Sequence, residues 1–170
     1  MSVENPVSID NRLFRDALGH YASGITIIGG MVADEPKGFT CQSFYSVSMT
    51  PPLVSFSVKL DSKSWPPIRS IGTFSVSLLS HHQEPISDAF ASSSTDRWAG
   101  VEWAKTKGGN PVITGSLLWM DCDIHAEHEV GDHWIVIGKL KELSKIDPVS
   151  AKEPLLYFKG QYRRLGEHRT

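Results

Sequence analysis

The chain has 170 residues and a formal net charge of -2, with 40% hydrophobic and 21% charged residues. This length and composition predict one domain over residues 1–170 with one hydrophobic core, preceded by a loose arm at residues 1–9. The slightly acidic balance argues against a general nucleic-acid binder, because such proteins are usually basic. The sequence has no apolar run of membrane-spanning length, so no membrane association is expected.

The ends of the chain and its cysteines indicate a compartment. The N-terminus lacks a basic segment followed by an apolar one, so no signal peptide is expected. The two cysteines, Cys41 and Cys122, lie far apart in the sequence. Without an export signal they are expected to be reduced thiols, which favours a cytoplasmic protein.

The first half of the chain predicts one helix followed by several strands. The helix is capped by Asp10 or Asn11, and its apolar residues recur at helical spacing as far as Tyr21. Turn residues separate the strands, and the Pro51-Pro52 pair is expected to end one of them. The ranges are strands at 25–33, 39–49, 53–58 and 73–80, a turn at 34–38, and a loop at 59–72 with a helical turn at 68–71.

The second half predicts two long strands. Apolar and polar residues alternate over the first of them, as in a half-buried antiparallel strand. Gly160 is expected to kink or bulge the last strand. The ranges are a short helix at 82–92, a long excursion at 92–116, strands at 116–130 and 134–144 joined by a turn at 131–133, and a last strand at 154–165.

These elements together define a fold class. Six or seven strands follow one another without regular helical crossovers, so the sheet is expected to be mainly antiparallel. Closure of such a sheet removes exposed strand edges. We therefore expect a mainly β protein, built as a small closed or partly open barrel with a few short helices.

The stretch GFTCQSFYSVSMTPP, residues 38–52, is rich in hydroxyl-bearing side chains. If it forms one pleated strand, Thr40 and Gln42 share a face with Ser46, while Cys41 and Ser43 share the other face. A face with neutral donors suits a flat polar heterocycle or a phosphate. A solvated strand face is the alternative interpretation.

A second polar stretch, KLDSKSW, follows the next strand. Ammonium groups act as point charges for a phosphate, and neighbouring hydroxyls complete its hydrogen bonds. An ordinary surface loop is the alternative. The candidate residues here are Lys59, Ser62, Lys63 and Ser64, with Arg69 and Arg97 as further possible phosphate partners.

The histidines do not predict a metal site. His125 and His128 point to opposite faces of a strand, and their spacing matches no zinc pattern. His133 differs because it follows a Gly-Asp turn, where an imidazole suits proton handling or a hydrogen bond to a cofactor. Simple exposure is the alternative. The sequence also contains no G-x-G-x-x-G, Walker or G-x-S-x-G motif.

In this order, the segments SGITIIGG, GFTCQSFYSVSMTPPLVSFSV and GDHWIVIGKLKEL resemble the short-chain flavin reductases of two-component flavin-dependent monooxygenases. The resemblance covers residues 14–162, and T-x-x-S-F-x-S-V-S-x-x-P-P and G-D-H are its most specific parts. It implies a split β-barrel with a Greek-key-like antiparallel sheet, and a homodimer with flavin near the interface. It also implies NAD(P)H:flavin oxidoreductase activity on FMN or FAD, with NADH favoured over NADPH, and release of reduced flavin to a separate monooxygenase.

The resemblance also implies roles by position. The isoalloxazine ring would be lined by Thr40, Cys41, Gln42 and Ser43. The ribityl and phosphate part would be held by Ser57, Val58, Lys59, Ser62 and Ser64. The adenosine or phosphate end would be bordered by Phe90 and Arg97. His133 would lie beside the ring where nicotinamide stacks, and Tyr162 would flank it. The family often has Ala-Asn where this chain has Cys41-Gln42.

Two other functions remain open at this point. A flavin-binding split barrel can store or sense flavin without turnover, since the fold does not determine the function. A flavin oxidase acting on an amine or a phosphorylated vitamer would need residues for an anionic substrate, and the sequence identifies none.

Overall fold

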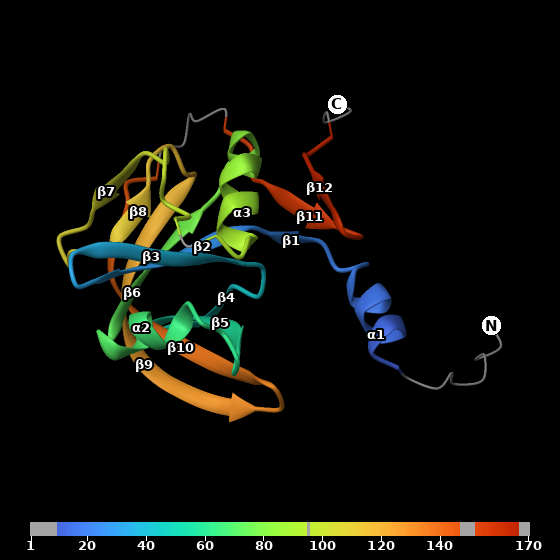
Figure 1. Ribbon diagram of the computed structural model, residues 1–170, viewed down its shortest axis with the longest axis horizontal. Helices are drawn as coiled ribbons and strands as arrows, with labels where there is room; N and C mark the ends of the chain where they lie inside the picture. The colour runs from blue at the N-terminus through green and yellow to red at the C-terminus, as the bar shows by residue number, and fades with distance from the viewer. Residues whose placement is uncertain (1–9, 95, 147–151, 167–170) are drawn as a thin grey trace.

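Strands make up most of the regular structure, which confirms the mainly β prediction (Figure 1). The computed structural model describes residues 10–94, 96–146 and 152–166, so the predicted arm at 1–9 lies outside the described residues, and the single domain over 1–170 stays a prediction. None of the described helices is long and apolar enough to cross a membrane. The helices are α1 (Asn11–Leu18), α2 (Trp65–Ser70), the 3-10 turn η1 (His81–Gln83) and α3 (Glu84–Ala91).

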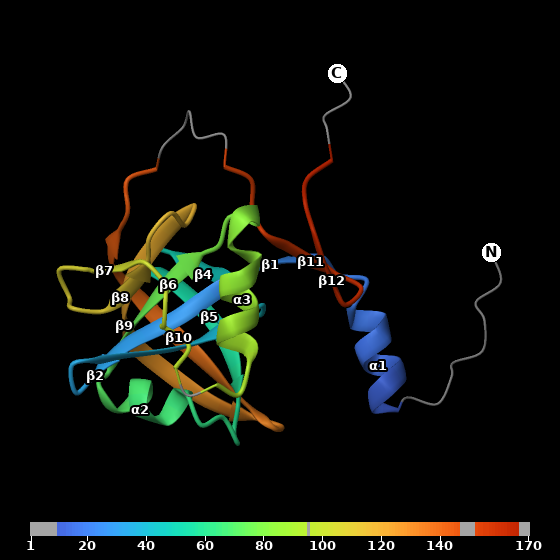
Figure 2. The same cartoon turned by 45° about the horizontal axis from the view of Figure 1, so that its top comes forward.

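The main sheet has seven antiparallel strands in the order β3-β2-β6-β9-β10-β5-β4. This order is not sequential, as a Greek-key-like topology requires, and the sheet curls into a barrel-like body (Figure 2). In chain order the strands are β2 (Thr26–Val32), β3 (Glu35–Cys41), β4 (Tyr45–Met49), β5 (Pro52–Lys59), β6 (Thr73–Leu78), β9 (Leu118–Val130) and β10 (His133–Leu143).

Two smaller sheets complete the strands. The first has the order β1-β11-β12 and carries the chain away from the barrel toward α1 (Figure 2). The second is the hairpin of β7 and β8, within the region expected to be a long excursion. Their bounds are β1 (Ser23–Gly24), β7 (Trp103–Lys105), β8 (Pro111–Ile113), β11 (Leu156–Phe158) and β12 (Gln161–Arg163).

Strand β3, at one end of the main sheet, approaches β5, the second strand from the other end, at the C-terminal end of β3. The rings of Phe39 on β3 and Phe56 on β5 meet edge to face, with centroids 6.1 Å apart. Just beyond β3, the Ser43 hydroxyl accepts a hydrogen bond from the Ser57 amide at 2.8 Å and donates to the Ser57 carbonyl at 3.1 Å. Ser43 therefore replaces the missing strand pairing at this point, and the barrel is split rather than closed by a continuous ladder.

The core lies between the sheet and α2. Phe56, Trp65 and Phe74 are each at most 1% exposed, and Trp65 meets the other two rings edge to face. Burial of such rings contributes roughly 1.5–3 kcal/mol each. A second buried cluster, which includes Phe90 and Leu155, packs α3 against the β1-β11-β12 sheet. The first cluster therefore holds α2 on the barrel, and the second cluster holds α3.

The predicted strand at 39–49 and the predicted turn at 34–38 are wrong. Ala33 and Asp34, both with positive φ, form a two-residue hairpin turn, so β3 already begins at Glu35. β3 then ends at Cys41 because it pairs with β2, whereas the next strand pairs with β5 at the opposite end of the sheet order. The chain crosses from one edge to the other over residues 42–44, so pleated alternation does not continue through Gln42.

Three further predictions need correction. The helix in the loop at 59–72 begins at Trp65, since two prolines suit the first helical turn. The strand expected at 154–165 is the β11-β12 hairpin, where Lys159 and Gly160 adopt positive φ in a two-residue turn. The turn expected at 131–133 is shorter, because His133 is the first residue of β10.

Helix α1 forms as expected but does not pack on the barrel. Asp10 caps it by accepting a hydrogen bond from the Leu13 amide at 2.7 Å. Its apolar residues are nevertheless open to solvent, with Leu13 40%, Phe14 55% and Leu18 56% exposed. The amphipathic face therefore has no partner among the described residues of the same chain.

Gly138 on β10 allows a close approach between the sheet and the core. A Cβ atom at this position would clash with the Phe74 ring and lie 3.2 Å from the Cys122 Cβ. We expect Gly138→Ala to lower the free energy of unfolding by about 1–3 kcal/mol, the usual cost of overpacking. Gly24→Ala is the matched control, since a Cβ there meets nothing within 4 Å. Equal urea midpoints for the two variants would contradict this packing argument.

Candidate functional site

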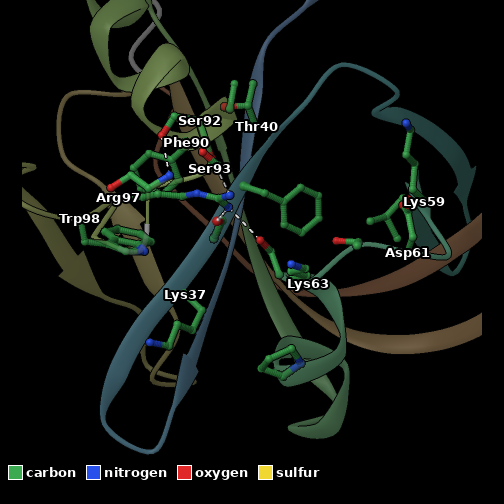
Figure 3. Close-up of a pocket in the computed structure, with 18 of the residues that line it drawn as sticks. Lys37, Thr40, Lys59, Asp61, Lys63, Phe90, Ser92, Ser93, Arg97 and Trp98 are labelled. Carbon is green, nitrogen blue, oxygen red and sulfur yellow. Dashed lines mark hydrogen bonds between the residues drawn. The ribbon is translucent and has the colours of Figure 1, made fainter.

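One open cavity of about 1010 Å³ lies between the barrel and α3 (Figure 3). Its walls come from β3, from β5 and the loop that follows it, from the end of α3 with the next loop, and from the start of β10. A cavity of this volume is large enough for a ligand of nucleotide size. The cavity walls join segments that are far apart in the sequence.

Basic side chains predominate among the charged groups of the cavity: Lys37, Lys59, Lys63 and Arg97 line it with a single carboxylate, Asp61. The Lys37 ammonium forms an ion pair with the Glu35 carboxylate, with Nζ 2.7 Å from Oε2. Among the residues that the structure describes, neither Lys59 nor Lys63 has an ion pair. Such a cleft focuses positive potential and attracts an anionic ligand.

The segment of residues 59–64, here called the cationic loop, presents hydroxyls beside its two lysines. The Ser62 hydroxyl accepts a hydrogen bond from the Trp65 amide at 3.3 Å. The Ser64 hydroxyl accepts one from Arg97 at 2.8 Å. Both serines are half-buried and line the cavity, which is the arrangement that a phosphate requires.

Arg97 reaches across the cavity and connects three of its walls (Figure 3). Its Nη1 donates to the Gly38 carbonyl at 2.9 Å as well as to Ser64, and its Nη2 donates to the Ser92 carbonyl at 2.7 Å. Its Nε is buried without a hydrogen-bond partner among the described residues, as is Nε1 of the neighbouring Trp98. These are two buried donors for which the described residues supply no acceptor.

The segment expected to line a flavin ring is only partly exposed to the cavity. Thr40 lines it, but its hydroxyl donates to the Ser87 carbonyl at 2.6 Å. Gln42 is exposed, and Ser43 is engaged by Ser57. Cys41 is 5% exposed, and burial raises the pKa of its thiol. The Thr40 and Ser43 hydroxyls thus stabilise the fold, so ligand contacts in this segment would depend on the backbone.

His133 stands at the edge of the cavity beside the cationic loop. It lies opposite Lys59 in the ladder of β10 and β5. Its Nδ1 lies 2.7 Å from the Asp132 carboxylate, and this hydrogen bond lowers the pKa of the Asp132 carboxyl. The contact orients the imidazole, whose other nitrogen is the one available to a ligand.

Tyr162 and Phe90 both belong to the packing around α3, but only Phe90 lines the cavity. The Tyr162 hydroxyl donates to the Asp88 carboxylate at 2.7 Å and accepts from the Ser87 hydroxyl at 2.9 Å, and burial raises its pKa to about 12. This ties the β11-β12 hairpin to α3 outside the cavity lining. Phe90 is 1% exposed, lines the cavity and meets Trp98 edge to face at 4.8 Å.

The cavity brings together most of the residues proposed from the sequence. Those lining it are Thr40, Ser57, Val58, Lys59, Ser62, Ser64, Phe90, Arg97 and His133. Those outside the lining are Cys41, Gln42, Ser43 and Tyr162. Their roles toward a ligand stay predictions. Arg69, weighed as a phosphate partner, instead donates to Glu127 at 2.7 Å.

Sequence reasoning missed several lining residues. Lys37 was hidden by the wrong turn at 34–38, and recognition of β3 would have revealed it on the same strand face as Phe39. Ser92, Ser93 and Ser94 form a polar run directly after α3, which is a signal that could have been used. Among the described residues, no three His, Cys, Asp or Glu side chains are grouped to hold a metal ion.

Comparison with known proteins identifies the family. Residues 18–166 match the flavin reductase like domain. The chain is 40% identical over 162 residues to HsaB, the reductase subunit of a flavin-dependent monooxygenase from Mycobacterium tuberculosis, covering 95% of this chain and 86% of that protein. The chain therefore belongs to the flavin reductase like domain family.

Solved structures support the same conclusion. Nitrilotriacetate monooxygenase component B from Mycobacterium thermoresistibile has a TM-score of 0.89 and 39% identity, over 94% of this chain and 88% of that one. The NADH:FAD oxidoreductase of Streptomyces globisporus, in complex with NAD and FAD fragments, has a TM-score of 0.89 and 32% identity, over 98% and 100%. The predicted split-barrel fold is confirmed.

The residues present fit a flavin nucleotide, which combines a flat ring, a polyol chain and a phosphate. The cationic loop offers ammonium groups and hydroxyls for the phosphate. Val58, Phe39 and Pro67 offer apolar surface for a ring. The buried Nε of Arg97 is a donor that still needs an acceptor. Size, charge and donor set therefore agree with the family.

Proposed function

We propose that the protein is an NAD(P)H:flavin oxidoreductase that reduces FMN or FAD and supplies reduced flavin to a separate monooxygenase. The observation that carries this proposal is one cavity in which a cationic, hydroxyl-bearing loop and His133 lie side by side. Membership of the flavin reductase like domain family supports it. The description of the mycobacterial relative as a monooxygenase reductase subunit supports the transfer of reduced flavin to a partner.

In this proposal the cationic loop holds the flavin phosphate. Lys59 and Lys63 supply positive charge, while Ser62 and Ser64 supply hydrogen bonds. Ser57 and Val58 lie on β5, directly before the cationic loop, and they border the ribityl chain. The ring lies toward the end of β3, where the backbone around Thr40 faces the cavity.

The bound cofactors supply the redox chemistry, since reduced nicotinamide donates a hydride and flavin accepts it. The protein's contribution is to bind and orient the two rings within reacting distance of about 3–3.5 Å. His133, oriented by Asp132, offers its free ring nitrogen at the edge where a nicotinamide would stack. No protein nucleophile is required, in agreement with the burial of Cys41.

We further propose NADH as the physiological reductant. The Streptomyces globisporus relative is described as an NADH:FAD oxidoreductase, and this supports the choice. The two cysteines are free and buried, which supports a reducing compartment such as the cytoplasm.

A homodimer is part of the same proposal. The exposed apolar face of α1 has no partner among the described residues of its own chain. Tyr45 is 52% exposed, Val47 45% and Met49 84%, so the edge strand β4 also offers apolar surface. Apolar surface on a projecting helix and on an edge strand is typical of an interface between copies.

The direct test is nicotinamide oxidation by the purified protein. We expect loss of the NADH absorbance only when FMN or FAD is added, with a lower kcat/KM for NADPH than for NADH. Assays across both flavins and both nicotinamides give the preferences. Flavin binding without nicotinamide oxidation would contradict the proposal and favour a storage or sensing protein.

His133→Ala tests the role of the imidazole. Because His133 stands at the cavity edge rather than in the cationic loop, we expect kcat/KM for NADH to fall about tenfold, a loss of about 1.4 kcal/mol in the transition state. The flavin dissociation constant should change less. His128→Ala, an exposed residue of the neighbouring strand, is the control. Equal kcat/KM for wild type and His133→Ala would exclude this role.

A further inference from the structure

Glu127 on β9 lies behind the cationic loop and is not part of the cavity lining. We propose that Glu127 is a positioning residue, which sets the cationic loop for phosphate binding through its hydrogen bonds to helix α2. The proposal rests on the flavin-binding role of the cavity given above. It assigns a role in flavin binding to a carboxylate that touches neither flavin nor nicotinamide.

Each oxygen of Glu127 has a partner on α2. The Trp65 Nε1 donates to Oε1 at 3.1 Å, and the Arg69 Nε donates to Oε2 at 2.7 Å. The Glu127 side chain is 14% exposed and the Trp65 bond is part-buried, whereas the Arg69 side chain is 44% exposed, so the Trp65 bond is the better shielded of the two. The Arg69 guanidinium also lies 4.5 Å over the Trp134 ring. Glu127 therefore fixes two positions of α2, one helical turn apart, to the sheet.

Helix α2 needs such an anchor. It has six residues, far fewer than the roughly 12–15 at which an isolated helix becomes even marginally stable. Ser64, at its N-cap position, makes no side-chain capping bond. Trp65 is 1% exposed, and its indole N–H would be buried without a partner if Glu127 were absent. The position of the first helical residue is thus set by the aromatic core together with this carboxylate, which is the partner of the indole N–H.

The position of Trp65 determines that of the cationic loop. Trp65 directly follows Ser64, and its amide donates to the Ser62 hydroxyl. On the cavity side, Arg97 holds Ser64 at 2.8 Å. The loop is therefore held from the cavity by Arg97 and from behind by Glu127. Hydrogen bonds to a phosphate require about 2.7–3.2 Å, so a small shift of the loop costs affinity.

The test compares the affinities of FMN and riboflavin, which differ by the phosphate. For Glu127→Gln, which keeps the size of the side chain but removes its charge, we expect the FMN dissociation constant to rise roughly tenfold. The riboflavin constant should stay nearly unchanged. Trp65→Phe, which removes the indole donor and also part of a buried ring, should give the same split between FMN and riboflavin together with a loss of overall stability. Glu129→Gln, an exposed carboxylate on the same strand, is the control.

Kinetics and hydrogen exchange separate positioning from general destabilisation. In Glu127→Gln we expect the KM for FMN to rise with kcat nearly unchanged, because the groups beside the rings are retained. In the ligand-free protein, amide exchange in residues 61–65 should become faster, while β2 and β6 stay protected. Equal losses for FMN and riboflavin, or faster exchange throughout the barrel, would overturn the positioning role.

The outcomes also distinguish this inference from the proposed function. An unchanged FMN dissociation constant in Glu127→Gln overturns the inference, whatever the turnover. A wild-type protein that binds FMN but does not oxidise NADH contradicts the proposed function, and the comparison of FMN constants still decides the role of Glu127. A wild type that binds FMN no better than riboflavin overturns the inference and the placement of the phosphate on the cationic loop, whereas the oxidoreductase activity is still decided by NADH oxidation.

Discussion

The approach of β3 to β5 across the split in the barrel is the constraint on which the site depends. Two contacts maintain it: the Phe39 and Phe56 rings at 6.1 Å, and the Ser43 hydroxyl bound to the Ser57 backbone. Because the two strands meet here without a continuous ladder, their ends remain open to a ligand. The cavity lies along this junction, with one wall from β3 and another from β5 and its loop.

The polar groups around this junction divide into those that build the fold and those left for a ligand. The Thr40 and Ser43 hydroxyls and the Arg97 guanidinium bond the walls to one another. In contrast, Lys59 and Lys63 have no ion pair among the described residues. A phosphate site needs both kinds of side chain. Lysines without an ion pair bind a phosphate tightly only if the loop that carries them is held in place. Arg97 and Glu127 supply that support from opposite sides.

Local patterns predicted much of the fold, and non-local contacts account for what they missed. The alternation of apolar and polar residues was sufficient to predict β9, and helical spacing was sufficient to predict α1, since both patterns depend on residues that are close in the sequence. The break at residues 42–44 arises because the chain changes partners from β2 to β5, which no local pattern records. In the site, the residue types of KLDSKSW and of the Gly-Asp-His turn indicated the cationic loop and His133, and the family resemblance agreed with them. It did not indicate Lys37 or Trp98, which reach the cavity only through the packing of β3 and the loop after α3.

The central claim is that this cavity binds flavin with its phosphate on the cationic loop and its ring beside His133. A crystal structure of the protein with bound FMN tests it most directly. The account predicts phosphate oxygens about 3 Å from the Lys59 ammonium and the Ser62 and Ser64 hydroxyls, with the ring between the end of β3 and His133. FMN bound elsewhere on the barrel, or with its phosphate directed away from residues 59–64, would contradict it.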